Sequence, residues 1–281
     1  VTIPVGLLGR LRWPLRRETL WSVHGPVVRG PRGTFALRVA GLGDVRPLQQ
    51  WYRLNRARTR EDWLAALGEQ AIPMFNTVYA TGRGQVGYVY NARLPLRAPG
   101  FDWRGSLPGD SPDALWNEFV PFERLPAVHD PPSGFVQNAN SSPFRTTLGP
   151  GNSDFARYPP ALGIETRMTN RALRLLELLG QDESITADEL LAYKYDTTYS
   201  SRSALAGSLR QLLAGPVPAD PLAARALALL RGWRLGASAD DRAAALALAL
   251  LAPEHDDRAI GGEAARHRLA NVAAHLQADF G

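Results

Sequence analysis

Two asparagines and two serines follow one another in residues 131–143, where their side chains could form a hydrogen-bonding site. The apolar residues before Asn138 and Asn140 predict a short strand that runs directly into them. An asparagine amide is a neutral donor, so at a strand end it can stabilise a developing oxyanion without itself titrating. A capped turn before Pro143 is the structural alternative, and composition alone favours that alternative.

The segment 82–87 matches the dinucleotide-binding pattern GxGxxG. That motif requires a helix N-terminus directly after the glycines, because the pyrophosphate binds there. Here Val86, Tyr88 and Tyr90 alternate with small or apolar residues and predict a strand instead. We therefore interpret the glycines as turn residues and expect no nucleotide at this position.

The five histidines show no HExxH or similar spacing that would place zinc ligands on one helix face. His24 precedes Gly25 and Pro26, which favours a turn or packing role over that of a general base. No GxSxG elbow marks a nucleophilic serine, although a serine triad stays open because its members need not be close in sequence. The absence of cysteine excludes disulfides, zinc thiolates and a cysteine nucleophile.

The composition is that of a globular protein with one large domain or two smaller ones. The chain has 281 residues, of which 45% are hydrophobic, and it includes seven tryptophans, so a disordered chain is excluded. No apolar run approaches the roughly 20 residues of a membrane span, and the longest candidate, 243–252, predicts a buried helix.

The net charge of +5 and the isoelectric point of about 9.9 raise the question of a nucleic-acid partner. Most arginines are interspersed with acidic residues, so we expect no nucleic-acid binding. One cluster stands apart, and we interpret it as a solvated strand face, with phosphate contact as the alternative. Its members are Arg10, Arg12, Arg16 and Arg17.

The amino-acid composition divides the chain into two parts with different expected secondary structure. Residues 1–160 are rich in proline, glycine and aromatic residues and predict strands and loops, whereas residues 161–281 are rich in alanine and leucine and predict helices. Strands followed by helices favour an α+β fold over a wound βαβ fold.

Turn and capping signals set the expected element boundaries. Thr59 with Asp62, and Thr186 with Glu189, are capping pairs, and Gly180 is expected to end a helix as a left-handed residue. The expected strands are 19–28, 34–39, 77–80 and 85–90. The expected helices are 47–57, 60–69, 163–179, 186–195, 201–213, 221–231, 239–251 and 263–277.

Five segments together resemble, in their order, the penicillin acylase family of N-terminal nucleophile hydrolases, which includes cephalosporin, aculeacin and acyl-homoserine-lactone acylases. The segments are 21–28, 84–88, 121–126, 131–140 and 163–167. The helical remainder of the chain resembles the family only loosely.

The resemblance implies a partial four-layer αββα fold, with residues 1–160 in the hydrolase core and 161–281 as the helical part of the same large (beta) subunit. In this family a precursor is cleaved into small and large subunits, and the new N-terminal serine attacks with its own amino group as base. Val1 has no such hydroxyl. We therefore expect this chain to be an internal piece of the large subunit that ends before the subunit's C-terminus. The nucleophile, the small (alpha) subunit and any export signal are then expected to be encoded upstream.

The implied activity is hydrolysis of a linear, non-peptide amide, releasing an acyl group from a β-lactam, an acyl-homoserine lactone or a lipopeptide. The implied location is the periplasm or exterior of a bacterium. Aromatic residues are candidates for an acyl pocket, with a core role as the alternative. They are Trp51, Tyr52, Phe75 and Tyr79.

The resemblance assigns two site residues. Asn140 matches the asparagine that completes the oxyanion hole, and Arg167 matches an arginine that helps to hold the catalytic arrangement. Asp154 matches one ligand of a structural calcium site found in some members, but no cofactor is assigned to this chain. The alternative function is a non-catalytic binding or interaction module derived from the same scaffold.

Overall fold

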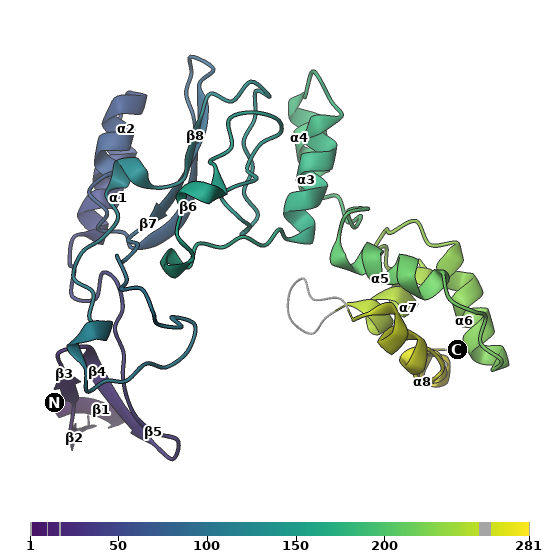
Figure 1. The fold of residues 1–281 in the computed structure, drawn as a ribbon, viewed down its shortest axis with the longest axis horizontal. Helices are drawn as coiled ribbons and strands as arrows, with labels where there is room; N and C mark the ends of the chain where they lie inside the picture. The colour runs from purple at the N-terminus through teal and green to yellow at the C-terminus, as the bar shows by residue number, and fades with distance from the viewer. Residues whose placement is uncertain (1, 10, 17, 253–259, 281) are drawn as a thin grey trace. The chain divides into compact units, whose positions relative to one another are not determined.

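The structure is a computed structural model that describes residues 2–9, 11–16, 18–252 and 260–280, as Figure 1 shows. Contacts within the chain separate it into two compact units. The first unit comprises Val1–Thr77, Tyr90–Leu125 and Phe155–Ile164, and the second comprises Val78–Val89, Pro126–Asp154 and Glu165–Gly281. Strands and short helices precede a helix-rich C-terminal part, so the predicted α+β class is confirmed. The predicted boundary near residue 160 stays a prediction.

The first unit begins with two antiparallel sheets, a two-stranded sheet of β1 and β2 and a three-stranded sheet. In the three-stranded sheet the order is β3-β4-β5, and Leu20 of β3 pairs with Val27 of β4. The expected single strand 19–28 is therefore wrong, because a turn at residues 23 and 24 folds it back on itself. Gly25 permits this turn, since it has φ +133° and a Cβ there would lie 2.2 Å from the Leu37 carbonyl oxygen. The strands are β1 (Thr2–Leu8), β2 (Leu11–Arg16), β3 (Leu20–Ser22), β4 (Gly25–Gly30) and β5 (Gly33–Ala36).

Helices α1 (Pro47–Arg56) and α2 (Arg60–Leu67) lie side by side in the first unit. The predicted capping pair at the start of α2 is confirmed: the Thr59 side chain accepts from the Asp62 amide, and the Asp62 side chain accepts from the Thr59 amide. The fully buried Gln50 of α1 joins the two helices, as its Nε2 donates to the carbonyl oxygens of Ala66 and Leu67 at 2.9 and 2.8 Å.

A further three-stranded sheet has the order β6-β7-β8. Its strands are β6 (Met74–Ala80), β7 (Val86–Ala92) and β8 (Ala127–His129). The predicted hairpin between β6 and β7 is confirmed, and a strand rather than a helix follows the glycine motif. Gly84 has φ +80° in the turn, and a Cβ on Gly87 would lie 2.3 Å from the Tyr79 ring. Both glycines therefore serve the hairpin.

Helix α3 (Asn170–Gly180) opens the helical part of the second unit seven residues later than residue 163, the predicted start. Thr169 is its N-cap, with its side chain accepting from the Ala172 amide. The prediction that Gly180 ends the helix in a left-handed conformation is also wrong, because the C-cap is Gln181 with φ −99°. Gly180 instead allows close packing, since a Cβ there would lie 2.2 Å from Cδ1 of Leu148.

The remaining helices follow the prediction closely. The capping box of Thr186 and Glu189 is confirmed at the start of α4. Helices α5 to α8 enclose an apolar core in which Leu212, Leu230 and Leu269 are fully buried. No helix among the described residues is long and apolar enough to cross a membrane. The helices are α4 (Ala187–Lys194), α5 (Ala204–Leu213), α6 (Pro221–Arg231), α7 (Arg242–Leu251) and α8 (Gly262–Phe280), and the 3-10 helices are η1 (Pro112–Ala114), η2 (Phe122–Arg124), η3 (Phe155–Arg157) and η4 (Pro160–Leu162).

Candidate functional site

Residues 131–143 lie in a loop of the second unit after β8. The predicted strand leading into the asparagines is wrong, because this segment hydrogen-bonds to the loop that follows it rather than to the sheet. The Gln137 amide donates to the Thr146 carbonyl oxygen at 2.7 Å, and its side-chain Nε2 donates to the Arg145 carbonyl oxygen at 3.0 Å. Gln137 is buried, so these bonds fix the entry to the asparagine pair.

Asn138 uses both ends of its amide within the loop. Its Oδ1 accepts from the Asn140 backbone amide at 3.1 Å, and its Nδ2 donates to the Ser141 carbonyl oxygen at 3.4 Å. Asn140 has φ +56°, a left-handed conformation that asparagine tolerates better than most residues. The two side chains therefore do not share one face of an extended strand, and Asn138 holds the turn that presents Asn140.

Asn140 is exposed, and its side-chain oxygen has a defined partner. Nη2 of Arg171 lies 3.0 Å from Oδ1 of Asn140. A guanidinium only donates hydrogen bonds, so the atom facing it must be the amide oxygen. Within the described part of the chain no hydrogen bond uses Nδ2 of Asn140, which leaves this donor available to a ligand.

The start of α3 anchors this loop. The Thr169 hydroxyl donates to the Ala139 carbonyl oxygen at 3.0 Å and accepts from the Ala172 amide at 3.2 Å. The Ser142 amide donates to the Arg167 carbonyl oxygen at 2.9 Å. Thr169 and Ser142 are both buried, so Asn140 lies between two fixed points.

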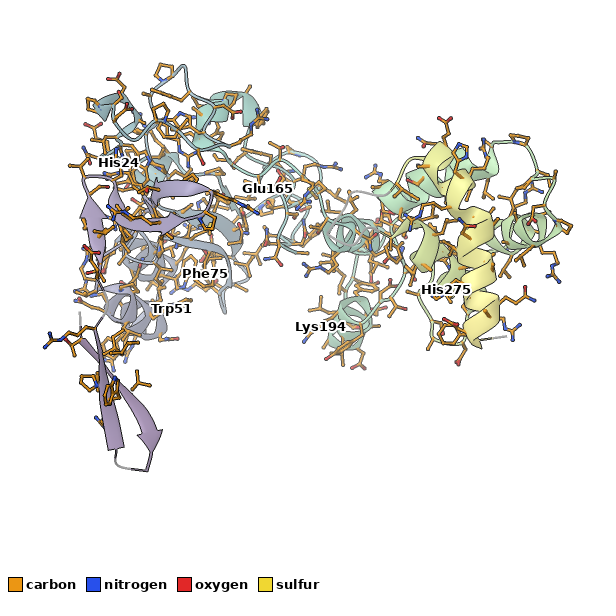
Figure 2. All side chains as sticks on the ribbon, turned by 90° about the horizontal axis from the view of Figure 1, so that it is seen from below. His24, Trp51, Phe75, Glu165, Lys194 and His275 are labelled. Carbon is orange, nitrogen blue, oxygen red and sulfur yellow. The ribbon has the colours of Figure 1, made fainter. Side chains whose placement is uncertain are left out.

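Arg167, the second predicted site residue, lies just before α3 with an exposed side chain. Its backbone amide donates to Oε1 of Glu165 at 2.7 Å, and Glu165 is labelled in Figure 2. The Arg167 carbonyl oxygen therefore contacts the asparagine loop at Ser142, which lies two residues after Asn140. The role of the Arg167 side chain stays a prediction.

The candidate metal residue Asp154 is exposed and follows Ser153. The Ser153 hydroxyl accepts from the Ala127 amide and donates to the Ala127 carbonyl oxygen, both at 3.0 Å. Among the described residues, no group of three or more His, Cys, Asp or Glu side chains could hold a metal ion. The calcium site in the complete enzyme stays a prediction that rests on the family resemblance.

His24 lies in the turn between β3 and β4, with its Nε2 3.2 Å from the Gly109 carbonyl oxygen (Figure 2). His129 lies with Nδ1 3.0 Å from the Tyr79 hydroxyl. Neither contact includes a carboxylate or a serine, and His255 lies outside the described residues.

The predicted aromatic pocket residues divide between the units, and three of them lie in the first. Trp51, Tyr52 and Phe75 are 41%, 63% and 54% exposed, so the alternative that they are core residues is wrong. Trp51 and Phe75 make an edge contact with ring centroids 5.9 Å apart (Figure 2).

A groove of about 950 Å³ lies beside the asparagine loop in the second unit, between residues of α3 and α4. Its apolar wall includes Val136, Leu175 and Leu190, while Asn138 and Arg171 contribute polar groups. Sequence reasoning missed both the groove and Arg171. One signal existed: a cation in the first turn of a helix opposes the positive end of the helix dipole, which is a local conflict typical of functional positions.

Arg174 lies one turn further along α3 in the same groove, but its charge is satisfied. Its guanidinium contacts Asp196 at 3.1 Å and Glu177 at 3.5 Å. The hydrogen bond from Arg174 holds the pKa of Asp196 below its ordinary value. This ion pair is therefore a structural link between α3 and the loop after α4.

A family model described as penicillin amidase matches residues 10–273. The chain belongs to the penicillin amidase family. It is 33% identical over 179 residues to penicillin G acylase of Escherichia coli, covering 61% of this chain and 20% of that protein. It is 32% identical over 90 residues to the acyl-homoserine lactone acylase PvdQ of Pseudomonas fluorescens (strain Pf0-1), covering 29% of this chain and 12% of that protein.

The fold is that of the penicillin acylases, as predicted. A solved structure of thermostable penicillin G acylase from Alcaligenes faecalis superposes with a TM-score of 0.73 and 19% identity, covering the whole of this chain and 60% of that one. The chain spans about a fifth of the length of the curated penicillin acylase from Escherichia coli.

Proposed function

We propose that this chain forms part of an amide hydrolase that releases an acyl group from a linear, non-peptide amide. Membership of the penicillin amidase family supports this assignment, as do relatives named penicillin G acylase and acyl-homoserine lactone acylase. The structural observation that supports it is the hydrogen bonding of Asn140. Its Oδ1 accepts from Arg171, while its Nδ2 is available as a donor.

In this proposal Asn140 donates its Nδ2–H to the oxyanion of the tetrahedral intermediate. The amide is neutral and held in place before the reaction, so it stabilises developing charge without reorganisation. Asn138 is the structural partner, because both ends of its amide are used by the turn. Arg167 helps to hold the arrangement from the segment before α3.

The attacking group of the proposal is the N-terminal serine of a processed large subunit, supplied from outside these 281 residues, with its own amino group as base. A small subunit from the same precursor completes the enzyme. The proposed substrates are acylated β-lactams, acyl-homoserine lactones or lipopeptides, and the proposed location is the bacterial periplasm or exterior.

The test uses the full-length protein that contains this chain, purified after any processing. Hydrolysis of phenylacetyl and fatty-acyl p-nitroanilides is measured for the parent protein and for Asn140→Asp. The aspartate keeps the shape, tolerates φ +56° and retains an acceptor for Arg171, but it loses the donor. We expect kcat to fall about a hundred- to a thousandfold with little change in KM.

Asn55→Asp on the exposed face of α1 is the matched control for added charge and should leave kcat unchanged. Normal kcat in processed, folded Asn140→Asp would assign the donor role elsewhere. Absence of turnover by the processed parent protein on both amides would favour the non-catalytic module.

A further inference from the structure

Arg171 lies in an unfavourable electrostatic position on its helix. It is the second residue of α3, where the positive end of the helix dipole disfavours a cation. The first turn of α3 carries no acidic residue that would offset this charge. An arginine at this position therefore needs another reason than helix stability.

The two arginines on this face of α3 differ in their partners. Arg174 is held by Asp196 and Glu177, whereas the side-chain bond of Arg171 goes to the neutral Oδ1 of Asn140. Among the residues that the structure describes, no carboxylate lies within ion-pair distance of Arg171. Its charge is consequently directed at Asn140 rather than neutralised.

This contact decides which way the Asn140 amide faces. The oxygen and nitrogen of an asparagine side chain can exchange places by a half-turn about χ2, and an exposed amide without a partner samples both orientations. A guanidinium cannot accept a hydrogen bond, so the reversed orientation would set two donors against each other. The bond therefore holds Nδ2 away from Arg171.

The charge of Arg171 has a second consequence for the same amide. A cation on the amide oxygen polarises the group and makes its N–H a stronger donor, because hydrogen bonds in series strengthen one another. This effect is larger in the transition state, where the oxyanion accepts from Nδ2, than in the ground state.

We propose that Arg171 is a positioning residue that orients and polarises Asn140 as the oxyanion donor. The inference rests on the proposed function, because it assigns Arg171 a role through Asn140. Arg171 acts from the first turn of α3, and the bonds of Thr169 and Ser142 keep that turn against the loop.

The test compares Arg171→Met, Arg171→Gln and Arg171→Lys in the full-length processed protein on the p-nitroanilide substrates. Arg171 is exposed, so these variants should fold normally. We expect Arg171→Met to lower kcat about ten- to a hundredfold, the size expected for loss of a charged hydrogen bond, with KM changed less than threefold. Arg171→Gln should fall as far or nearly as far, and Arg171→Lys should recover at least part of the loss.

A double-variant cycle separates positioning from a general effect on the fold. If Arg171 acts through Asn140, then adding Arg171→Met to Asn140→Ala should lower kcat no further than Asn140→Ala alone. Fully additive losses would overturn the proposal. Arg202→Met, which removes an exposed arginine in the same unit, is the charge-matched control and should leave kcat unchanged.

The two proposals fail in different ways. Loss of kcat in Asn140→Asp with normal kcat in Arg171→Met and Arg171→Gln would refute the positioning role and leave the oxyanion assignment intact. Normal kcat in Asn140→Asp would refute both the oxyanion assignment of Asn140 and the positioning role of Arg171. A loss in Arg171→Met that Arg171→Lys does not relieve would also count against positioning through a donated hydrogen bond.

Discussion

The Thr169 hydroxyl joins the first turn of α3 to the backbone of Ala139, the residue before Asn140. Its Oγ1 lies 3.0 Å from the Ala139 carbonyl oxygen and 3.2 Å from the Ala172 amide. One side chain therefore both starts the helix and fixes the loop, and Thr169 is only 6% exposed.

Replacing Thr169 by valine should destabilise the protein and reduce activity together. The change keeps the shape but removes the cap and the bond to Ala139, so we expect a loss of about 1–2 kcal/mol in the free energy of unfolding. Because Asn140 then loses a fixed neighbour, kcat should fall at least about tenfold. Chemical denaturation and p-nitroanilide hydrolysis measure the two effects.

Thr169→Ser retains the hydroxyl and should preserve both properties. Thr186→Val is the matched control, because it removes the equivalent cap from α4 without a bond to the asparagine loop. It should cost about 1 kcal/mol and leave kcat unchanged. Equal losses of kcat in Thr169→Val and Thr186→Val would contradict the anchoring role.

Gln50→Leu should destabilise the first unit strongly. The Gln50 side chain satisfies the carbonyl oxygens of Ala66 and Leu67 and accepts from the Ile72 amide at 2.6 Å. Leucine fits the apolar surroundings but leaves these buried groups unpaired, at a cost of about 2–4 kcal/mol in unfolding free energy. Gln49→Leu, at the exposed neighbouring position, should change stability by less than about 0.5 kcal/mol in urea denaturation. Similar unfolding midpoints for the two variants would show that the buried bonds contribute little.

Acid should weaken the link between Arg174 and Asp196. The hydrogen bond from Arg174 lowers the pKa of Asp196 below 3.8, so the folded state binds this proton more weakly than the unfolded state. The resulting stabilisation is fully present above about pH 4 and is lost as the pH falls through the lowered pKa. Urea denaturation from neutral pH down to about pH 2 should show a smaller acid-induced loss in Asp196→Asn than in the parent protein. An identical pH dependence in both would exclude this pair as a source of acid sensitivity.

The basic isoelectric point should not produce binding to DNA. Arg12 and Arg16 are exposed on β2, paired in register with Gly6 and Thr2 of β1, while Arg10 and Arg17 lie outside the described residues. Most arginines of the chain are interspersed with acidic residues, whereas phosphate-driven affinity requires clustered cations. Fluorescence anisotropy with a labelled duplex should give no submicromolar binding at about 150 mM salt. Salt-sensitive submicromolar binding that disappears in Arg12→Gln/Arg16→Gln would overturn this prediction.

The sequence by itself determined the elements whose signals are local. The capping pairs at Thr59 and Thr186 each place both partners within one helical turn, so the pattern specifies the hydrogen bonds directly. The hairpin around Gly84 is equally local, since alternating residues on both sides set its register. The resemblance of short ordered segments also sufficed to predict the family and its fold.

Only the tertiary structure decided how the candidate site is built. The α3 helix begins at Asn170 because Thr169 bonds to Ala139, 30 residues away, and helical periodicity alone carries no information about that contact. The expected strand before Asn140 gives way to a loop because Gln137 bonds to residues that follow it. The partner of Asn140 is 31 residues distant in sequence. Such contacts depend on which distant segments the folded chain brings together. Spacing rules cannot predict them, because those rules describe only neighbours within one helix or strand.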